Sequence, residues 1–234
     1  MLELYIANKN YSSWSLRPWL LMRELGIPFT EHLVPFTAGG SSWATFRAFS
    51  PTGRVPCLHD TGEDRPPVVV WDSLAIAEYL AEYEPGVWPA DTRARAWARS
   101  AAAEMHSGFG ALRARCSMTV GQRVRMPPVP DALAADVARV DELWTEGPAR
   151  FGGPFLAGPR FTAVDAFYAP VAFRWQTYGF ALGAAATAYA RRLLALPGMV
   201  AWTEAALAET WRDEAHERDI ASLGEVTEDL RATP

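Results

Sequence analysis

The chain has 234 residues, half of them hydrophobic, which is enough to bury one large core or two smaller ones. Its formal net charge is −5 at pH 7 and it contains no basic block, which argues against nucleic acid as a partner. The first ten residues lack the segments of a signal peptide and no apolar run has the length of a membrane span, so we expect a cytoplasmic protein without membrane contact.

The first 85 residues have the pattern of a small α/β domain. Strand, helix and strand follow one another closely, which predicts a βαβ unit with parallel strands, and a ββα unit completes it. The expected elements are a strand at 2–6, a helix at 16–25, a strand at 29–36, a short helical piece within the loop 37–54, strands at 55–59 and 68–71, and a helix that begins after Asp72 or Ser73.

From about residue 90 the pattern is helical and predicts no further strand. The expected helices cover residues 92–116, 131–144, 162–178, 184–196 and 198–207. The sequence therefore predicts two domains, residues 1–85 and an all-helical domain at 92–220, followed by a frayed tail at 221–234.

A cluster of serines surrounds Trp14 at the start of the first helix. One of them is needed as a helix cap, and Ser15 is a good candidate, but Ser12 and Ser13 remain. A helix start favours an anion, and a hydroxyl beside it can donate a hydrogen bond to a thiolate. The cluster is therefore either a generous cap or a thiol-activating site.

Two further segments have a structural and a functional interpretation. In "TGRVPCL", Pro56 either opens an edge strand or follows a cis peptide bond, which would turn the backbone of Val55 outward toward an extended peptide. In "VVVWDSLAIAEYL", Asp72 and Ser73 either cap a helix or bind the ammonium and carboxylate groups of an amino acid.

Taken together, these segments resemble the glutathione transferase superfamily. The first half is similar to its thioredoxin-like domain, and the helical second half fits the same family. "FTAVDAFYAPV" looks like the family's folding capping box, with Thr162 as the cap and Asp165 three residues later. The resemblance implies glutathione as co-substrate, a small electrophile as second substrate, and a homodimer.

Within the superfamily, "SSWSLRPWLLMRELGIP" is similar to the zeta class, whose Ser-Ser-Cys-Ser run has Trp14 in place of the cysteine here. That cysteine is linked with maleylacetoacetate isomerase activity. By resemblance, the activating serine is Ser12, with Ser13 as the fallback. The glutathione-binding residues that the resemblance implies are Ser12, Ser13, Trp14, Ser15, Arg17, Val55, Pro56, Asp72 and Ser73.

The second substrate is expected between the two domains, against "EMHSGFGALRARC". The candidates there are His106, Phe109, Arg113 and Arg115, with Trp175 and Tyr178 as further candidates. Phe109 has helical spacing from Met105 and Leu112, which also fits a core position, and the arginines also fit a solvated face. A guanidinium that faces the cleft would bind a substrate carboxylate.

Other chemistry is not indicated. The four histidines have no metal-ligand spacing, and Cys57 and Cys116 have no pairing pattern. Ser12 and Ser15 stand where thioredoxin relatives have two cysteines, so dithiol exchange is excluded at that position. The expected function is serine-type glutathione transfer. The alternatives are a zeta-like isomerase or dehalogenase that acts on a small carboxylate, and a non-catalytic binding protein with this fold.

Overall fold

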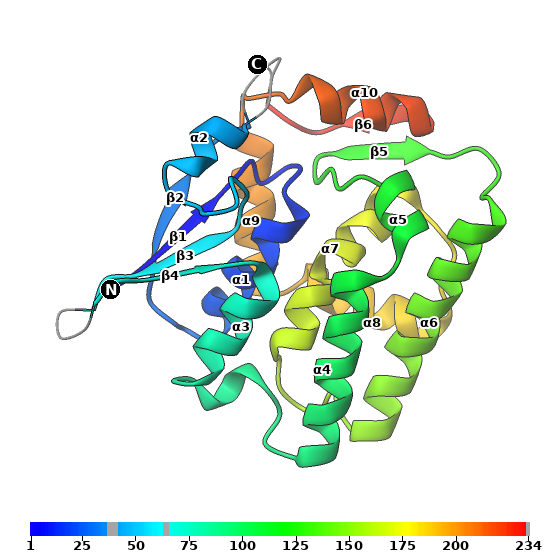
Figure 1. Cartoon of the computed structure of the whole chain (residues 1–234). Helices are drawn as coiled ribbons and strands as arrows, with labels where there is room; N and C mark the ends of the chain where they lie inside the picture. The colour runs from blue at the N-terminus through cyan, green and yellow to red at the C-terminus, as the bar shows by residue number, and fades with distance from the viewer. Residues whose placement is uncertain (37–41, 63–65, 233–234) are drawn as a thin grey trace.

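The computed structural model of the chain describes residues 1–36, 42–62 and 66–232 (Figure 1). A four-stranded sheet forms the N-terminal part, in the order β2-β1-β3-β4. Its strands are β1 (Leu2–Ile6), β2 (Thr30–Leu33), β3 (Cys57–Asp60) and β4 (Val68–Trp71). β1 is parallel to β2 and antiparallel to β3, and β3 is antiparallel to β4, as the βαβ and ββα units predict.

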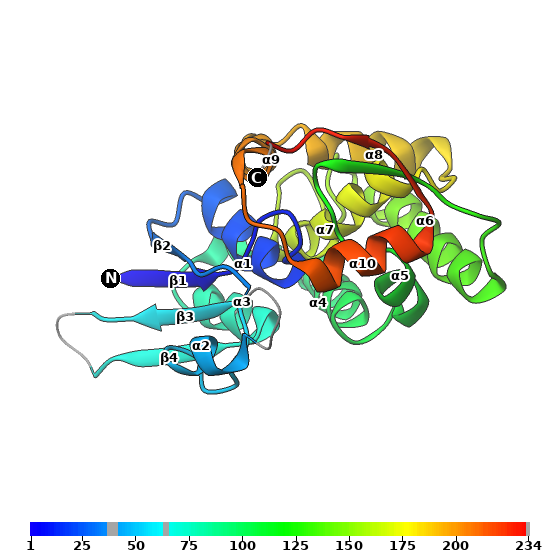
Figure 2. The same ribbon diagram turned by 90° about the horizontal axis from the view of Figure 1, so that it is seen from above.

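Three helices accompany the sheet. They are α1 (Ser13–Glu24), the short α2 (Trp43–Arg47) and α3 (Ser73–Ala81), and a 3-10 turn at Pro85–Val87 follows. α1 and α3 lie between the sheet and the helical half of the molecule, as both views show (Figures 1 and 2). The side of α1 that faces inward is almost wholly buried, because Leu16, Leu20 and Leu21 pack into the common core.

The second half is mainly helical. Its helices are α4 (Thr92–Ser107), α5 (Gly110–Arg115), α6 (Asp131–Phe151), α7 (Ala163–Tyr178), α8 (Ala184–Leu194), α9 (Pro197–Ala208) and α10 (Glu214–Leu223). α7 is buried along nearly its whole length and packs against α1, α4 and α8. Within the described residues, no helix combines the length and the apolar character that a bilayer crossing requires.

The predicted capping box at the start of α7 is present. Thr162 N–H donates to Asp165 Oδ2 at 2.9 Å, and both capping contacts are formed. Asp165 also accepts hydrogen bonds from Leu156 N–H and from the Tyr189 hydroxyl. The loop before α7 is thereby fixed to the buried helix.

The prediction of an all-helical second half is wrong in one respect, because a second sheet forms there. β5 (Gln122–Arg125) pairs antiparallel with β6 (Glu225–Asp229). These strands are polar, and β6 is exposed along its whole length, so neither shows a hydrophobic alternation. The expected frayed tail is therefore ordered by strand pairing as far as residue 229.

One helical prediction also needs correction, and one further helix was not predicted. The expected helix 92–116 is broken at Gly108 and Phe109, where Phe109 has a left-handed backbone with φ of 54°. α10 was not predicted, because it is strongly charged and only Ile220 is buried on it. α10 packs against β6, and Figure 1 shows the two side by side at one end of the molecule.

Candidate functional site

A cavity of about 980 Å³ lies where the sheet domain meets the helices. Its walls come from the serine turn, the segment after β2, the loop before β3, the α4–α5 junction, α7 and the beginning of α10. Of the residues predicted from the sequence, five line it, namely Ser12, Ser13, Trp14, Val55 and Arg113. A cavity at a domain junction is the usual place for a small-molecule site.

The serine turn divides its hydroxyl groups between structure and cavity. Ser12, and not Ser15, is the N-cap of α1, because the helix begins at Ser13. The Ser12 hydroxyl donates to Ser15 Oγ at 2.7 Å, and Ser15 Oγ also accepts from Ala7 N–H at 3.2 Å. Both side chains are buried, so this pair ties the helix start to the end of β1.

Within the serine turn, Ser13 has a hydroxyl group available to the cavity. It is only partly buried, and its oxygen accepts a hydrogen bond from Arg174 Nη2 at 3.4 Å. The hydroxyl hydrogen is not used in any contact among the described residues. Because the N-cap side chain leaves the first turn of α1 without a side-chain cap, the helix start remains open to a ligand.

Positive charge gathers around Trp14. The Arg17 guanidinium lies 4.1 Å from the centre of the Trp14 ring, and the Arg113 guanidinium lies 4.7 Å from it. Arg17 and Arg174 are buried, and burial lowers the pKa of Arg17 to about 9 and that of Arg174 to about 10. Both therefore stay cationic at neutral pH.

These three arginines lack acidic partners. In the part of the chain that the structure describes, Arg17, Arg113 and Arg174 form no ion pair with a carboxylate. Arg113 instead donates to the carbonyl oxygens of His106 and Gly108, and Arg174 donates to that of Cys116. Arg113 and Arg174 line the cavity, and guanidinium groups without an ion-pair partner there favour an anionic ligand.

Asp72 and Ser73 lie at the start of α3, as the sequence predicts. Asp72 is the N-cap, with an unusual φ of 77°, and its Oδ1 accepts from Leu74 N–H at 2.8 Å. Its Oδ2 lies 3.4 Å from His106 Nε2. Ser73 is buried, and its Oγ accepts from Arg17 Nη1 at 3.4 Å. These contacts join the sheet domain to α4.

His106 lies beside this pair and does not line the cavity. Burial lowers its pKa, the nearby Asp72 carboxylate raises it, and the Arg17 and Arg113 guanidinium groups lower it further. Its Nδ1 is buried and has no hydrogen-bond partner among the described residues. Its ring contacts Trp14 edge-on, with 5.3 Å between the ring centres.

Val55 also lines the cavity. The peptide bond between Val55 and Pro56 is cis, which is one of the two interpretations that the sequence allowed. Among the described residues, the N–H and C=O groups of Val55 make no backbone hydrogen bond. Pro56 is buried behind it. An extended ligand thus finds an unpaired backbone on this wall.

Several predicted pocket residues are outside the cavity. Phe109 is buried and contacts the ring of Tyr168 edge-on, because its left-handed backbone turns the chain at the start of α5. Arg115 is exposed at the end of α5. Tyr178 is buried with its hydroxyl on the Ser117 carbonyl, and Trp175 lies in another surface hollow.

Many lining residues were not predicted from the sequence, among them Tyr11, Phe36, Arg174, Asp213 and His216. Tyr11 stands beside the predicted serines, and an Asp-x-x-His pair is visible in the sequence at 213–216. These signals become a site only when the chain end folds back onto the serine turn. The described residues contain no group of three or more histidines, cysteines or carboxylates that has metal-binding geometry.

Comparison with known proteins agrees with the fold. Residues 11–83 match the family described as "Glutathione S-transferase, N-terminal domain". The chain is 24% identical over 185 residues to the glutathione S-transferase-like protein OpS6 of Beauveria bassiana, which covers 72% of this chain and 77% of that protein.

Solved structures with a similar fold also include glutathione transferases. Glutathione transferase Omega 1C from Trametes versicolor matches with a TM-score of 0.66 and 19% identity, and the match covers 100% of this chain and 99% of that one. A glutathione transferase homolog from Burkholderia, solved with bound glutathione, matches with a TM-score of 0.62 and 23% identity over 88% of this chain and 97% of that one. Residues 11–83 therefore match a glutathione S-transferase N-terminal domain, and the chain as a whole has the glutathione transferase fold.

Proposed function

We propose that the chain is a glutathione transferase in which Ser13 activates the glutathione thiol. The observation that carries this proposal is the Ser13 hydroxyl at the start of α1, which lines the cavity and accepts a hydrogen bond from Arg174. Its own hydrogen can then be donated to a thiolate. Ser12, the first choice from the sequence, already donates its hydrogen to Ser15. We therefore propose Ser13, and not Ser12, as the residue that activates the thiol.

The rest of glutathione has candidate partners at Val55, which lines the cavity, and at Asp72 and Ser73, which lie outside its lining at the start of α3. The unpaired backbone of Val55 can bind the cysteinyl part of the tripeptide as an extended strand does. The Asp72 carboxylate and the Ser73 hydroxyl at the start of α3 suit the ammonium and carboxylate groups of the γ-glutamyl end. Relatives of this fold from Burkholderia and Xanthomonas have been solved with glutathione bound, which supports the choice of ligand.

The proposed reaction needs no other cofactor. The bound thiolate attacks an electrophilic carbon, a carbon–sulfur bond forms, and the leaving group departs with its electron pair. Positive charge from the helix start and from Arg174 favours the thiolate over the thiol. Serine donation and this charge together lower the pKa of the bound thiol.

A second candidate is favoured by Arg113, one of the two arginines expected from the sequence to bind a substrate carboxylate if they face the cleft. Because Arg113 and Arg174 line the cavity without acidic partners, a small substrate with a carboxylate suits the site. This supports a zeta-like isomerase or dehalogenase, in which the thiolate adds to a double bond or displaces a halide. Trp14, which stands in place of the zeta cysteine, has the Arg17 and Arg113 guanidinium groups 4.1 and 4.7 Å from its ring centre.

We also propose a homodimer. β4 is an edge strand, and its Val69 and Trp71 side chains are 36% and 45% exposed. Apolar side chains on an exposed edge suit a protein interface. Light scattering of the eluting protein measures its mass, and a monomeric mass at micromolar concentration would contradict the proposal.

Calorimetric titration with glutathione tests the function. We expect wild type to bind glutathione below millimolar concentration, whereas the dipeptide cysteinylglycine, which lacks the γ-glutamyl group, binds much more weakly. Asp72→Ala should weaken the binding of glutathione and leave the binding of the dipeptide unchanged, because Asp72 contacts only the γ-glutamyl group, which the dipeptide lacks. No glutathione binding at millimolar concentration would overturn the proposed function and favour a non-catalytic role for the fold.

A further inference from the structure

His216 lies on the cavity wall beside the serine turn, although it is far away in the sequence. It belongs to the first turn of α10 and lines the same cavity as Ser13. Its ring is stacked between Tyr11 and Phe36, with ring centres 5.1 and 5.3 Å apart and planes within 23° and 24°. Tyr11 directly precedes Ser12, so the imidazole lies next to the start of α1.

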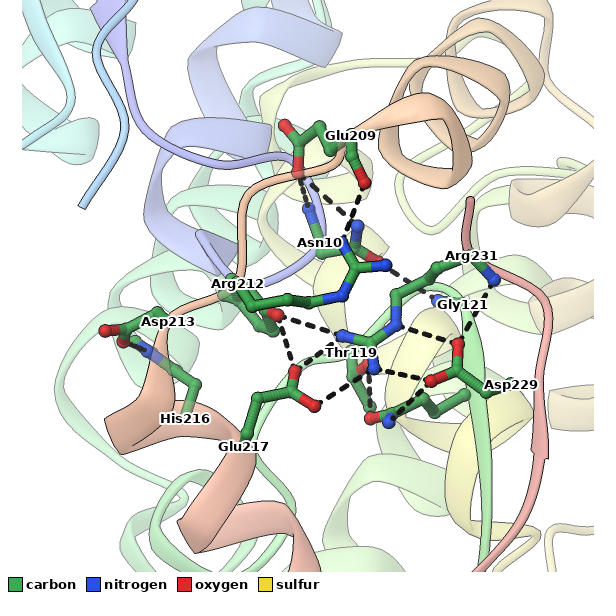
Figure 3. Close-up of polar contacts among 12 residues, drawn as sticks. Asn10, Thr119, Gly121, Glu209, Arg212, Asp213, His216, Glu217, Asp229 and Arg231 are labelled. Atoms are coloured by element: carbon green, nitrogen blue, oxygen red, sulfur yellow. Dashed lines mark hydrogen bonds and ion pairs between the residues drawn. The ribbon is translucent and has the colours of Figure 1, made fainter. Parts of the chain in front are cut away.

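Asp213 orients this imidazole. Its Oδ2 is in contact with His216 Nδ1 (Figure 3). When Nδ1 carries the hydrogen and donates it to the carboxylate, the lone pair is on Nε2. Nε2 makes no hydrogen bond to the residues that the structure describes. A carboxylate that holds the far nitrogen of a histidine is the arrangement of an oriented general base.

The end of the chain holds α10 in this position. Glu217 accepts a hydrogen bond from the Tyr11 hydroxyl at 2.5 Å and forms a two-point ion pair with Arg231. Arg231 also binds Asp229 on β6 at 2.6 Å (Figure 3). In the segment that leads from α9 to α10, the Glu209 carboxylate accepts a hydrogen bond from Lys9 N–H at 2.6 Å. The imidazole is thus fixed relative to the serine turn from both sides.

The proposed reaction also needs a residue that accepts the proton of the glutathione thiol. When glutathione forms its thiolate, the sulfur must lose a proton, and a serine hydroxyl donates a hydrogen bond but does not take up that proton. Tyr11 is not suited, because its hydroxyl is bound to Glu217 and burial raises its pKa. Arg54, Arg113 and Arg174 are cations. Among the described lining residues, His216 with its partner Asp213 remains.

We propose that His216, oriented by Asp213, accepts the proton of the glutathione thiol, an inference that rests on the function proposed above. The S–H bond breaks with its electron pair left on sulfur, and a new N–H bond forms on Nε2, directly or through one water. The imidazolium is stabilised by the Asp213 carboxylate. The proton later goes to the leaving group or to solvent, and in an isomerisation it returns to the departing thiol.

The charges around His216 set the conditions of the test. The acidic groups near His216 are Asp213 and Glu217, and the basic groups are Arg212 and Arg231. Tyr11, in the turn before α1, is the titratable group that faces His216 from the N-terminal part of the chain. Since these groups also respond to pH, the number of protons released is a sharper measure than a pH profile alone.

The experiment counts protons released when glutathione binds and forms its thiolate. Calorimetry in two buffers of different ionisation enthalpy gives the protons released, and thiolate absorbance gives the thiolate formed. In wild type we expect clearly less than one proton per thiolate, because the imidazole keeps it. His216→Gln should release about one proton per thiolate, and Asp213→Asn should lie between them. His32→Gln, a histidine outside the cavity, is the matched control and should equal wild type.

Turnover with a chlorodinitrobenzene provides an independent readout. His216→Gln should lower kcat by about 10², at the low end of the contribution of a positioned proton acceptor, while glutathione affinity changes by less than about twofold. A full proton released by wild type, or equal proton counts and kcat in His216→Gln, would overturn the inference. Failure of wild type to bind glutathione would overturn the proposed function as well, so the two failures are distinguishable.

Discussion

The Arg174 guanidinium lies 3.4 Å from the Ser13 hydroxyl oxygen, although 161 positions separate the two residues in the chain. This contact joins the central helix α7 to the start of α1. In this contact the Ser13 oxygen accepts a hydrogen bond from a cation, and the Ser13 hydroxyl hydrogen stays available for a ligand. The Ser12 hydroxyl, in contrast, donates its hydrogen to Ser15 Oγ. The two neighbouring serines therefore have different tasks.

Ser12→Ala should act on stability more than on catalysis. The substitution removes the buried hydrogen bond to Ser15 Oγ, and we expect a loss of about 1 kcal/mol in the free energy of unfolding. Urea unfolding of the variant beside wild type measures this loss. A fall of about 10²-fold in kcat with unchanged stability would instead make Ser12 the activating residue.

Arg113→Gln should reduce the preference for acidic substrates. If Arg113 binds a substrate carboxylate, kcat/KM for an electrophile with a carboxylate falls by about 10 to 100-fold, whereas the corresponding amide changes little. Arg115→Gln is the matched control, because Arg115 is exposed at the end of α5 and does not line the cavity. Equal losses for the acid and the amide would show that Arg113 acts only on the fold.

Asp165 should make folding stability depend on pH. Burial raises the pKa of its carboxyl to about 6, against about 3.9 in an unfolded chain, so between these values the folded state holds a proton that the unfolded state has lost. The stabilising contribution of Asp165 is therefore complete below about pH 4 and is lost as the pH rises through about 6, a change on the order of 3 kcal/mol.

Asp165→Asn removes this titration. We expect the stability of wild type relative to Asp165→Asn to be greatest near pH 4 and to decline toward pH 7, measured by urea unfolding at each pH. A difference that grows with pH would mean that the hydrogen bonds from Leu156, Thr162 and Tyr189 keep the carboxylate ionised.

Arg231→Met should loosen the end of the chain. The Arg231 side chain is 3% exposed and pairs with Glu217 and Asp229, which are partly exposed, so we expect a loss of about 2 kcal/mol. Arg218→Met breaks an exposed pair with Glu214 and should cost less than about 0.5 kcal/mol. Hydrogen exchange in α10 should rise only in Arg231→Met. Equal stability of the two variants would contradict the proposed anchoring role of Arg231.

The sequence predicted what depends on local pattern. The strand alternation at Leu4 and Ile6, the Asp72 cap and the Thr162 capping box are local, and each is present in the structure. What it missed depends on distant partners. β6 is stabilised by pairing with β5, and α10 buries only Ile220, so neither shows an apolar period.

The candidate site shows the same division. Ser13, Val55 and Arg113 come from motifs, and they line the cavity. Arg174 and His216 reach it from α7 and α10, and no spacing in the sequence relates them to the serine turn. Phe109 is buried in the core, as its spacing from Met105 and Leu112 allowed, although the helix breaks at Gly108.

The pKa of the thiol of bound glutathione is the most direct test of the central claim. Thiolate absorbance followed against pH gives this pKa for wild type, Ser12→Ala and Ser13→Ala saturated with glutathione. We expect wild type to lower the thiol pKa well below its free value of about 8.5, and Ser13→Ala to return it most of the way, with Ser12→Ala close to wild type. A thiol pKa that is the same in wild type and Ser13→Ala would contradict the claim that Ser13 activates the thiol.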